Sequence, residues 1–262
     1  MKVISIANQK GGTGKTTTTV NLGAGLALKG FKVLAVDLDI QCNTTHTLWG
    51  NLGSDEEGVC EVLLNKKKID GIIRKTKTEN LYLAPAGESL VDADINLVSQ
   101  VGREQVLKGS LNISEVSTFD FVLIDTAPYL GLLTLNALVA SDYVLIPVSC
   151  EYLPMLGLKW LISAINRVKD NLNSKLEILG FLLTMYDRRE RITTDVEDIL
   201  REQFGDGVFN TVIRINTKFK AAPSEQKTIF QYENRKDGRG TSDYERLTSE
   251  VLSRLGVNTR LI

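Results

Sequence analysis

The chain has 262 residues, of which 43% are hydrophobic and 24% charged, enough to bury the core of one large α/β domain. Lysine and arginine (31) nearly balance aspartate and glutamate (32), so no field of one sign covers the molecule, and contact with nucleic acid would need a local basic patch. Three isolated cysteines and one histidine argue against a disulfide framework or a metal cluster, and they fit a reducing compartment.

Short apolar runs alternate with helix-length amphipathic stretches along the chain. Strands are predicted at 3–7, 32–36, 81–84, 121–124, 144–147, 176–185 and 208–213. Helices are predicted at 16–29, 132–140, 155–171, 193–204 and 241–255. Continuous Val/Ile/Leu runs separated by helices indicate a twisted, mostly parallel sheet with helices on both faces. We expect a single α/β domain over 1–262, with short helices at the sheet edge in 54–78 and an exposed basic loop at 233–241.

The N-terminal segment enters an apolar strand at once, without the longer hydrophobic region of a signal peptide. No apolar run approaches about 18 residues, the length that a transmembrane helix needs. We therefore expect a soluble, cytoplasmic protein with no stable membrane association.

A glycine-rich segment between the first strand and the first helix has the pattern of a phosphate-binding loop. Its residues are Lys10, Gly11, Gly12, Thr13, Gly14, Lys15, Thr16 and Thr17. Glycines let backbone N–H groups point at a phosphate, and the following helix adds its positive N-terminal end. In this pattern Lys15 neutralises phosphate oxygens and Thr16 ligates Mg²⁺, so ATP and Mg²⁺ are the expected ligands. The alternative, a glycine-rich turn with two chance lysines, does not explain the strand before it and the helix after it.

Carboxylates follow two of the predicted strands. Asp37 and Asp39 alternate after the strand 32–36, so both are expected to face the phosphates at the carboxyl edge of the sheet. The strand 121–124 leads into Asp125, the Walker B arrangement, which is predicted to hold the Mg²⁺ shell through water. The predicted metal site is therefore Thr16, Asp39 and Asp125. The alternative for Asp37 and Asp39 is that they are turn residues.

The loop Lys10-Gly11-Gly12-x-Gly14-Lys15-Thr16 departs from the ordinary pattern, because Gln9 stands where a glycine is usual and a second lysine, Lys10, opens the loop. It resembles the deviant Walker A motif of the ParA/MinD family. Segments 130–138, 144–148, 183–187 and 222–224 are similar to the ParA/Soj branch of chromosome and plasmid partition ATPases, so the resemblance covers nearly the whole chain.

This resemblance implies a P-loop NTPase with slow, Mg²⁺-dependent hydrolysis. It also implies a homodimer that forms on ATP binding, coats double-stranded DNA nonspecifically and is released by a ParB-like activating protein. The chain begins at the first strand, which favours the short type without an N-terminal DNA-reading extension. The nucleoid is then the expected location of the ATP state.

The resemblance also assigns roles to single residues. Lys10 would reach across the dimer to the phosphates of the other subunit, Lys15 would act in cis, and Asp39 would orient the attacking water. Asn216 is assigned to the nucleotide site. The family has Asp-Pro-Gln-Gly where this chain has Ile40 and Cys42 in the proline and glycine positions, so the geometry of that loop is expected to differ.

Basic residues bind DNA on one face of the dimer in short ParA proteins. The matching positions here are Arg188, Arg189, Arg214, Lys218, Lys220 and Arg239, with Arg191 and Arg235 nearby. These charges suit phosphate contacts without base reading. The alternative is an ordinary solvated surface.

Three other classes of function share the loop. A MinD-like membrane-surface ATPase needs a C-terminal amphipathic helix, whereas the segment 250–262 is short and interrupted by Gly256. An iron–sulfur reductase of the nitrogenase iron-protein type needs cluster cysteines, and none of the three cysteines matches that motif. A ParA-like positioning ATPase for another large cargo would use the same chemistry, and this alternative stays open.

Overall fold

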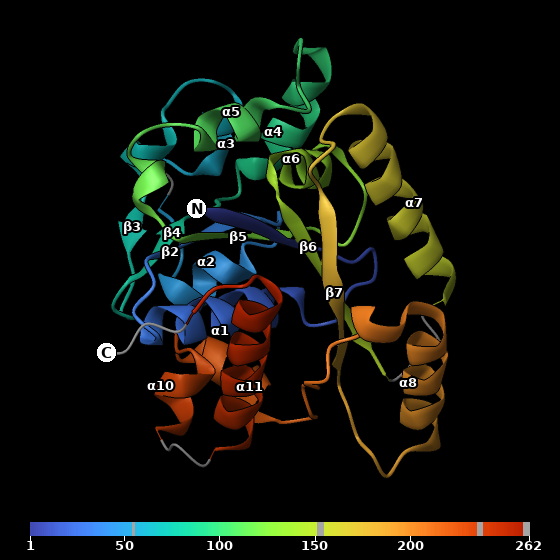
Figure 1. Cartoon of the computed structure of the whole chain (residues 1–262). Helices are drawn as coiled ribbons and strands as arrows, with labels where there is room; N and C mark the ends of the chain where they lie inside the picture. The colour runs from blue at the N-terminus through green and yellow to red at the C-terminus, as the bar shows by residue number, and fades with distance from the viewer. Residues whose placement is uncertain (54–55, 151–154, 235–237, 259–262) are drawn as a thin grey trace.

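The computed structural model describes residues 1–53, 56–150, 155–234 and 238–258 (Figure 1). These ranges form one seven-stranded sheet in the order β3-β4-β2-β5-β1-β6-β7, in which only the β3–β4 pair is antiparallel. The strands are β1 (Lys2–Ile6), β2 (Val33–Leu38), β3 (Arg74–Lys75), β4 (Leu81–Ala84), β5 (Phe121–Thr126), β6 (Tyr143–Ser149) and β7 (Glu177–Thr184). The predicted α/β class and parallel sheet are confirmed.

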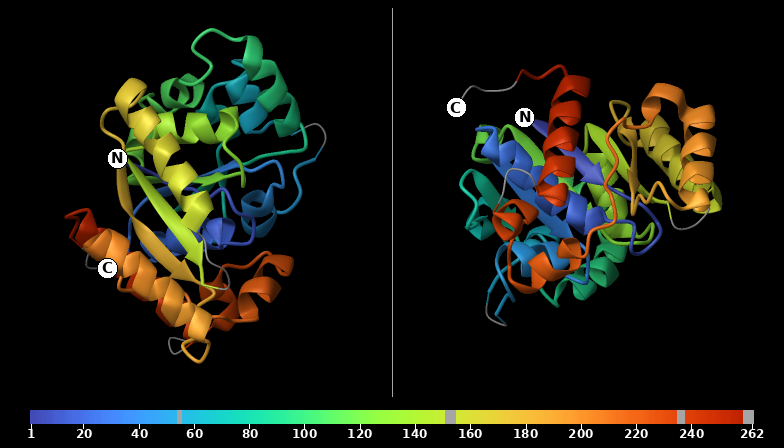
Figure 2. Two further views of the ribbon diagram at one scale, coloured as in Figure 1. Left: turned by 90° about the vertical axis from the view of Figure 1, so that its right-hand side faces the viewer. Right: turned by 90° about the horizontal axis from the view of Figure 1, so that it is seen from below.

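Helices cover both faces of this sheet, as Figures 1 and 2 show from three directions. The helices are α1 (Lys15–Leu28), α2 (Asn43–Leu48), α3 (Val59–Leu63), α4 (Leu90–Asn96), α5 (Val106–Leu111), α6 (Leu132–Ala140), α7 (Met155–Asn171), α8 (Arg191–Phe204), α9 (Lys218–Ser224), α10 (Ile229–Glu233) and α11 (Arg239–Arg254). Short 3₁₀ turns are η1 (Ile69–Ile72), η2 (Leu97–Ser99), η3 (Val116–Thr118) and η4 (Gly205–Gly207). The short helices expected within 54–78 are present as α3 and η1, beside the edge strand β3.

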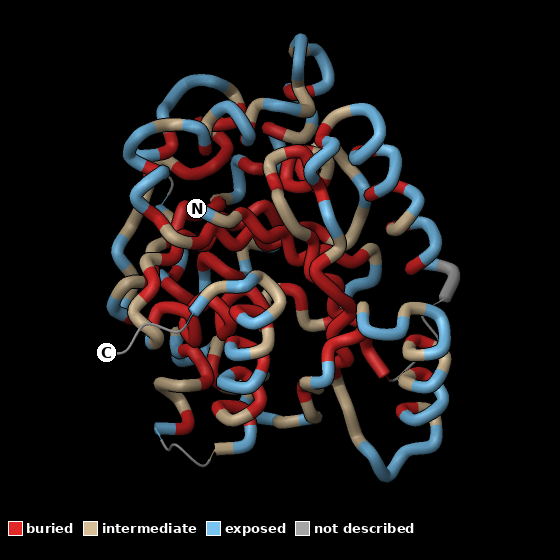
Figure 3. The backbone as a smooth tube through the Cα atoms, viewed as in Figure 1, coloured by how far each residue is buried: buried red, intermediate tan, exposed pale blue. Residues whose placement is uncertain are grey.

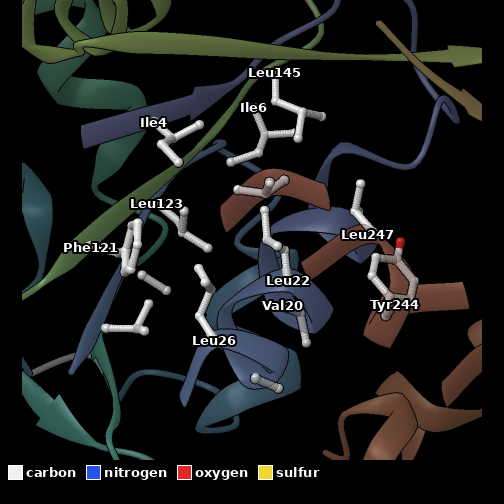
Figure 4. Close-up of a cluster of buried hydrophobic side chains, with 14 of the residues drawn as sticks. Ile4, Ile6, Val20, Leu22, Leu26, Phe121, Leu123, Leu145, Tyr244 and Leu247 are labelled. Atoms are coloured by element: carbon white, nitrogen blue, oxygen red, sulfur yellow. The ribbon is translucent and has the colours of Figure 1, made fainter. Parts of the chain in front are cut away.

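The core lies between these layers because the central strands are apolar on both sides. One cluster joins α1 and α11 to the sheet, with Leu22, Phe121 and Tyr244 fully or almost fully buried (Figure 4). A second cluster packs α3 to α6 on the opposite face, and a third packs α7 and α8 against β6 and β7. The buried backbone therefore runs through the middle of the molecule, with exposed segments around it (Figure 3). No helix in the described ranges is both long enough and apolar enough to span a membrane.

The prediction of a strand at 208–213 is wrong. Only single bridges, Phe181 to Val208 and Tyr186 to Arg214, connect this part of the chain with β7 and the residues after it. The carboxylate of Glu250 on α11 accepts the backbone N–H groups of Asn210 and Thr211, both at 2.8 Å. These two donors are thus taken from a strand ladder, and the segment runs as an irregular cover beside β7.

The prediction of an exposed basic loop at 233–241 is also wrong where the structure describes it. Glu233 ends α10 and is 7% exposed. Its carboxylate accepts the backbone N–H of Thr241 at 2.8 Å, near the start of α11. The last predicted helix therefore begins at Arg239, two residues earlier than expected. Residues 235–237, including Arg235, lie outside the described ranges.

Candidate functional site

The phosphate loop leaves β1 at Ile6 and enters α1 at Lys15. Gly12 (φ 74°) and Gly14 (φ 88°) have left-handed backbone conformations, which disfavour residues with a Cβ. The side chain of Asn8 donates to the carbonyl of Pro147 at 2.6 Å and accepts the N–H of Lys10 at 3.1 Å. The ends of neighbouring strands therefore hold the start of the loop in place.

Lys15 is buried and directed back into the loop, where its Nζ donates to the carbonyl of Lys10 at 3.1 Å. Burial lowers the pKa of this amine, and the charges of Asp125 and Asp39 partly oppose that shift. Gly11 and Gly12 are exposed, and a Cβ on either would meet no atom within 4 Å. The loop thus offers an open, glycine-lined surface with a lysine at its base, as a phosphate site requires.

The acid at the end of β5 is joined to the loop. Oδ2 of Asp125 accepts hydrogen bonds from the hydroxyl groups of Thr16 at 2.7 Å and Thr44 at 2.8 Å. Oδ1 of Asp125 is buried and has no hydrogen-bond partner within the described ranges. Burial raises the pKa of Asp125, and the charge of Asp37 raises it further. This carboxylate therefore lacks a counter-charge.

Asp37 lies opposite Asp125 in the register of β2 and β5, but its oxygens are used differently from our expectation. They accept the backbone N–H of Thr45 at 2.8 Å, the Thr45 hydroxyl at 2.7 Å and the N–H of Asp39 at 3.1 Å. Asp37 thus fixes the start of α2 instead of facing the phosphate loop. Asp39 is 6% exposed and close enough to Lys15 to influence its charge.

A divalent cation fits this donor set. Mg²⁺ prefers hard oxygen ligands and keeps several waters, and the site offers the Thr16 hydroxyl, the Asp125 carboxylate with its unpartnered oxygen, and Asp39. In the described ranges, no group of three or more His, Cys, Asp or Glu residues is arranged to hold an ion by itself. The cation would therefore need further oxygens, which the phosphates of a nucleotide supply.

Reading the sequence missed three threonines that build the site. Thr44 and Thr45 connect α2 to the two strand-end acids, and the hydroxyl of Thr184 at the end of β7 donates to the carbonyl of Thr13 at 2.9 Å. All three are buried. Their only sequence signal is position, because each lies at or just after the carboxyl end of a parallel strand.

Asn216 lies two residues before α9, apart from the phosphate loop in its contacts. Its Nδ2 donates to Glu233 at 3.3 Å, and its Oδ1 accepts the N–H of Lys218 at 3.0 Å. Neither contact involves the loop, so a role at the nucleotide stays a prediction.

The basic residues after β7 are exposed to solvent. Arg188 and Arg189 follow Asp187, and Arg189 forms an ion pair with that residue at 2.6 Å while its own side chain stays 89% exposed. Arg239, the first residue of α11, is also exposed. These residues are available for phosphate contacts.

The basic residues near α9 differ in their surroundings. Arg214 forms a two-pronged ion pair with Asp243, whose side chain is only 2% exposed, so much of its charge serves the fold. Lys218 pairs with the buried Glu233 at 3.3 Å. Lys220 is exposed and forms no ion pair with any residue in the described ranges. It is therefore the strongest of these positions for a ligand contact.

Comparison with known proteins identifies relatives over nearly the full length. Residues 1–178 match a family described as "AAA domain". The chain is 44% identical over 250 residues to the sporulation initiation inhibitor protein Soj of Bacillus subtilis, covering 95% of this chain and 98% of Soj. It is 42% identical over 256 residues to the chromosome-partitioning ATPase Soj of Treponema pallidum, covering 97% and 98%.

Solved structures share the fold at similar coverage. Cobyrinic acid a,c-diamide synthase from Mycobacterium smegmatis, with bound ADP and magnesium, has a TM-score of 0.83 and 30% identity over 100% of this chain and 98% of that one. A putative plasmid partition protein from Borrelia burgdorferi, bound to AMPPNP, has a TM-score of 0.81 and 25% identity over 97% and 99%. With the loop, the strand-end acids and these relatives together, the chain belongs to the ParA/MinD family of ATPases, in its short ParA/Soj branch.

Proposed function

We propose that the protein is an ATP-dependent dimerising switch that binds DNA nonspecifically in its ATP state and hydrolyses ATP to drive DNA partition. The observation that carries this proposal is the 2.7 Å hydrogen bond between Thr16 and Asp125, because it joins the phosphate loop and the strand-end acid into one oxygen-rich site. The Soj relatives, one of them named a chromosome-partitioning ATPase, support the same function.

Each residue of the site has a separate task. Lys15 binds the phosphates after leaving the carbonyl of Lys10, and the exposed N–H groups of the loop surround them. Thr16 and Asp125 hold Mg²⁺, which neutralises charge on the phosphate oxygens when it is bound. Asp39 orients the attacking water. Asp37 and the start of α2 keep Asp39 in position, since Asp37 accepts the N–H of Asp39.

Lys10 makes the switch depend on a second subunit. Its backbone N–H is fixed by Asn8 and its carbonyl by Lys15, while the residue as a whole is exposed on the open side of the loop. We assign its ammonium group to the phosphates of the opposing subunit. ATP then binds the dimer more tightly than the monomer, so nucleotide state and oligomeric state are coupled.

The DNA contacts belong to the exposed basic residues, with Lys220, Arg188 and Arg189 as the main positions. A ParB-like activating protein ends the ATP state. The same chemistry would serve a positioning ATPase for another large cargo, and the identity of the activator separates these two functions.

Co-sedimentation tests the proposal directly. The protein is incubated with ATP or ADP, each with plasmid DNA or with anionic liposomes, at low and at high salt. We expect ATP-dependent pelleting with DNA that high salt abolishes, because phosphate contacts release counterions. Pelleting with liposomes in its place would contradict the proposal and favour a membrane-surface ATPase. Lys15→Gln should lose ATP binding, and unchanged affinity would refute the role of the loop.

A further inference from the structure

The outward face of α4 and η2 carries an apolar stripe that no part of the described chain covers. Val91, Ile95 and Val98 are 47%, 66% and 58% exposed. Their spacing of i, i+4 and i+7 places them on one side of the helix. The opposite side already buries Leu90, Ala93 and Leu97 in the core. The segment is therefore apolar on two faces, and the second one, the α4 surface of Val91, Ile95 and Val98, has no internal partner.

The rim of the α4 surface is acidic. Glu88 and Asp92 are exposed beside the stripe, and residues 86–102 include three acidic residues and no lysine or arginine. Beyond the far end of the stripe, Lys66 to Lys68 line a groove together with Val101. Lys67 in that groove pairs with Glu57 at 2.9 Å. The negative charge therefore lies along α4 itself, next to the apolar side chains.

The α4 surface is connected to the nucleotide site. Asp94, on the same helix, accepts a hydrogen bond of 3.0 Å from the hydroxyl of Tyr129. Tyr129 lies in the loop that follows β5 and thus comes four residues after Asp125. Leu130, next in the chain, is 39% exposed. A partner seated on α4 would therefore press on the loop that leaves the Mg²⁺-binding strand.

We propose that the α4 surface docks a basic amphipathic segment of a partner protein, and that Tyr129 transmits the docking to the nucleotide site. Apolar side chains of the segment cover the stripe, and its lysines or arginines meet Glu88 and Asp92. The same acidic rim repels nucleic acid and anionic lipid. It also disfavours a second copy of this chain, because two-fold pairing of the surface would bring like charges together. The transmission step rests on the proposed function, whereas the docking step does not.

The test uses a labelled helical peptide of about four turns, with leucines at i, i+3 and i+4 and lysines elsewhere, and a matched peptide with glutamates in place of lysines. Fluorescence anisotropy without nucleotide should show binding of the lysine peptide only. Ile95→Asp and Asp92→Lys should each weaken it about tenfold or more, through lost apolar burial and reversed charge. Both positions are exposed, so the fold is retained. Trp160→Asp on α7 changes another exposed apolar side chain (69%) and should leave affinity unchanged.

Three results would overturn the docking step: equal affinity of Ile95→Asp and wild type, loss of self-association as the main effect of Ile95→Asp in light scattering, or tighter binding to anionic vesicles than to the peptide. Transmission is tested with Tyr129→Phe, which removes the hydroxyl that bonds Asp94. This variant should bind the peptide normally while the peptide no longer changes its rate of ATP hydrolysis. A response equal to that of wild type would refute transmission, whereas absence of hydrolysis in wild type would refute the proposed function and leave docking to the anisotropy result.

Discussion

The hydroxyl of Thr45 offers a sharp test of how the strand-end acids are held. It donates to Asp37 at 2.7 Å and accepts the backbone N–H of Ala86 at 2.8 Å. Thr45 and Ala86 are each 1% exposed, so water cannot replace either bond. Thr45→Val keeps the shape of the side chain and removes both hydrogen bonds.

The cost follows from the two bonds. Losing a hydrogen bond to an acidic group costs about 1.5–3 kcal/mol, and leaving the buried N–H of Ala86 without a partner costs about 1–3 kcal/mol. We expect Thr45→Val to lower the free energy of unfolding by about 3–5 kcal/mol. Thr47→Val is the matched control on the same helix, because its hydroxyl donates only to the carbonyl of Asn43, four residues earlier. That loss should cost about 1 kcal/mol.

Urea unfolding followed by circular dichroism measures both variants. Equal losses for Thr45→Val and Thr47→Val would refute the claim that Thr45 ties α2 to Asp37. Hydrolysis adds a functional reading, because loosening Asp37 also loosens the backbone of Asp39. The turnover number of Thr45→Val should therefore fall, at a temperature where the variant is folded, while that of Thr47→Val stays close to wild type.

Three further outcomes are expected. Burial raises the pKa of Asp125 from 3.8 to about 7, so its contribution to the stability of the nucleotide-free protein is fully present below about pH 4 and lost as the pH rises through about 7. Mg²⁺ needs the ionised carboxylate, so calorimetry should show weaker Mg²⁺-dependent ATP binding at about pH 6 than at about pH 8, and the reverse order would contradict the site. Lys220→Glu should weaken ATP-dependent DNA binding and reduce its salt slope by about one per contact, unlike the exposed control Lys169→Glu on α7; equal slopes would exclude Lys220 as a phosphate contact. Cys42→Gly should raise stability by about 0.5–1 kcal/mol in thermal unfolding, because Cys42 has φ 52°, and a lower melting temperature would argue against strain there.

The sheet could be predicted from the sequence because its strands are buried on both faces. Such strands are continuous apolar runs, and β1, β2, β5, β6 and β7 all stand out in this way. The helices α9 and α10 were not predicted, since seven and five residues are too few for a helical period to show. The segment 208–213 has the composition of a strand, but a carboxylate from α11, about 40 residues away in the chain, takes two of its N–H groups.

The site divides in the same way. Lys15, Thr16 and Asp125 belong to local motifs, so the sequence predicts their places. Thr44 and Thr184 act across 81 and 171 residues of chain, and a single threonine has no local pattern that marks such a contact. The basic residues illustrate a further limit. Positive charge can be counted in a sequence, whereas the buried carboxylates that neutralise Arg214 and Lys218 become visible only in the fold.

The central claim, that ATP drives dimerisation through Lys10, is tested most directly by molar mass. Light scattering after size exclusion is measured on Asp39→Ala, with Mg²⁺ and either ATP or ADP. We expect twice the 29.0 kDa of one chain with ATP and a single chain with ADP. Adding Lys10→Ala should leave a monomer in both, whereas adding Lys169→Ala as a control should leave the ATP dimer intact. A dimer with ADP, or an unchanged ATP dimer without Lys10, would contradict the account.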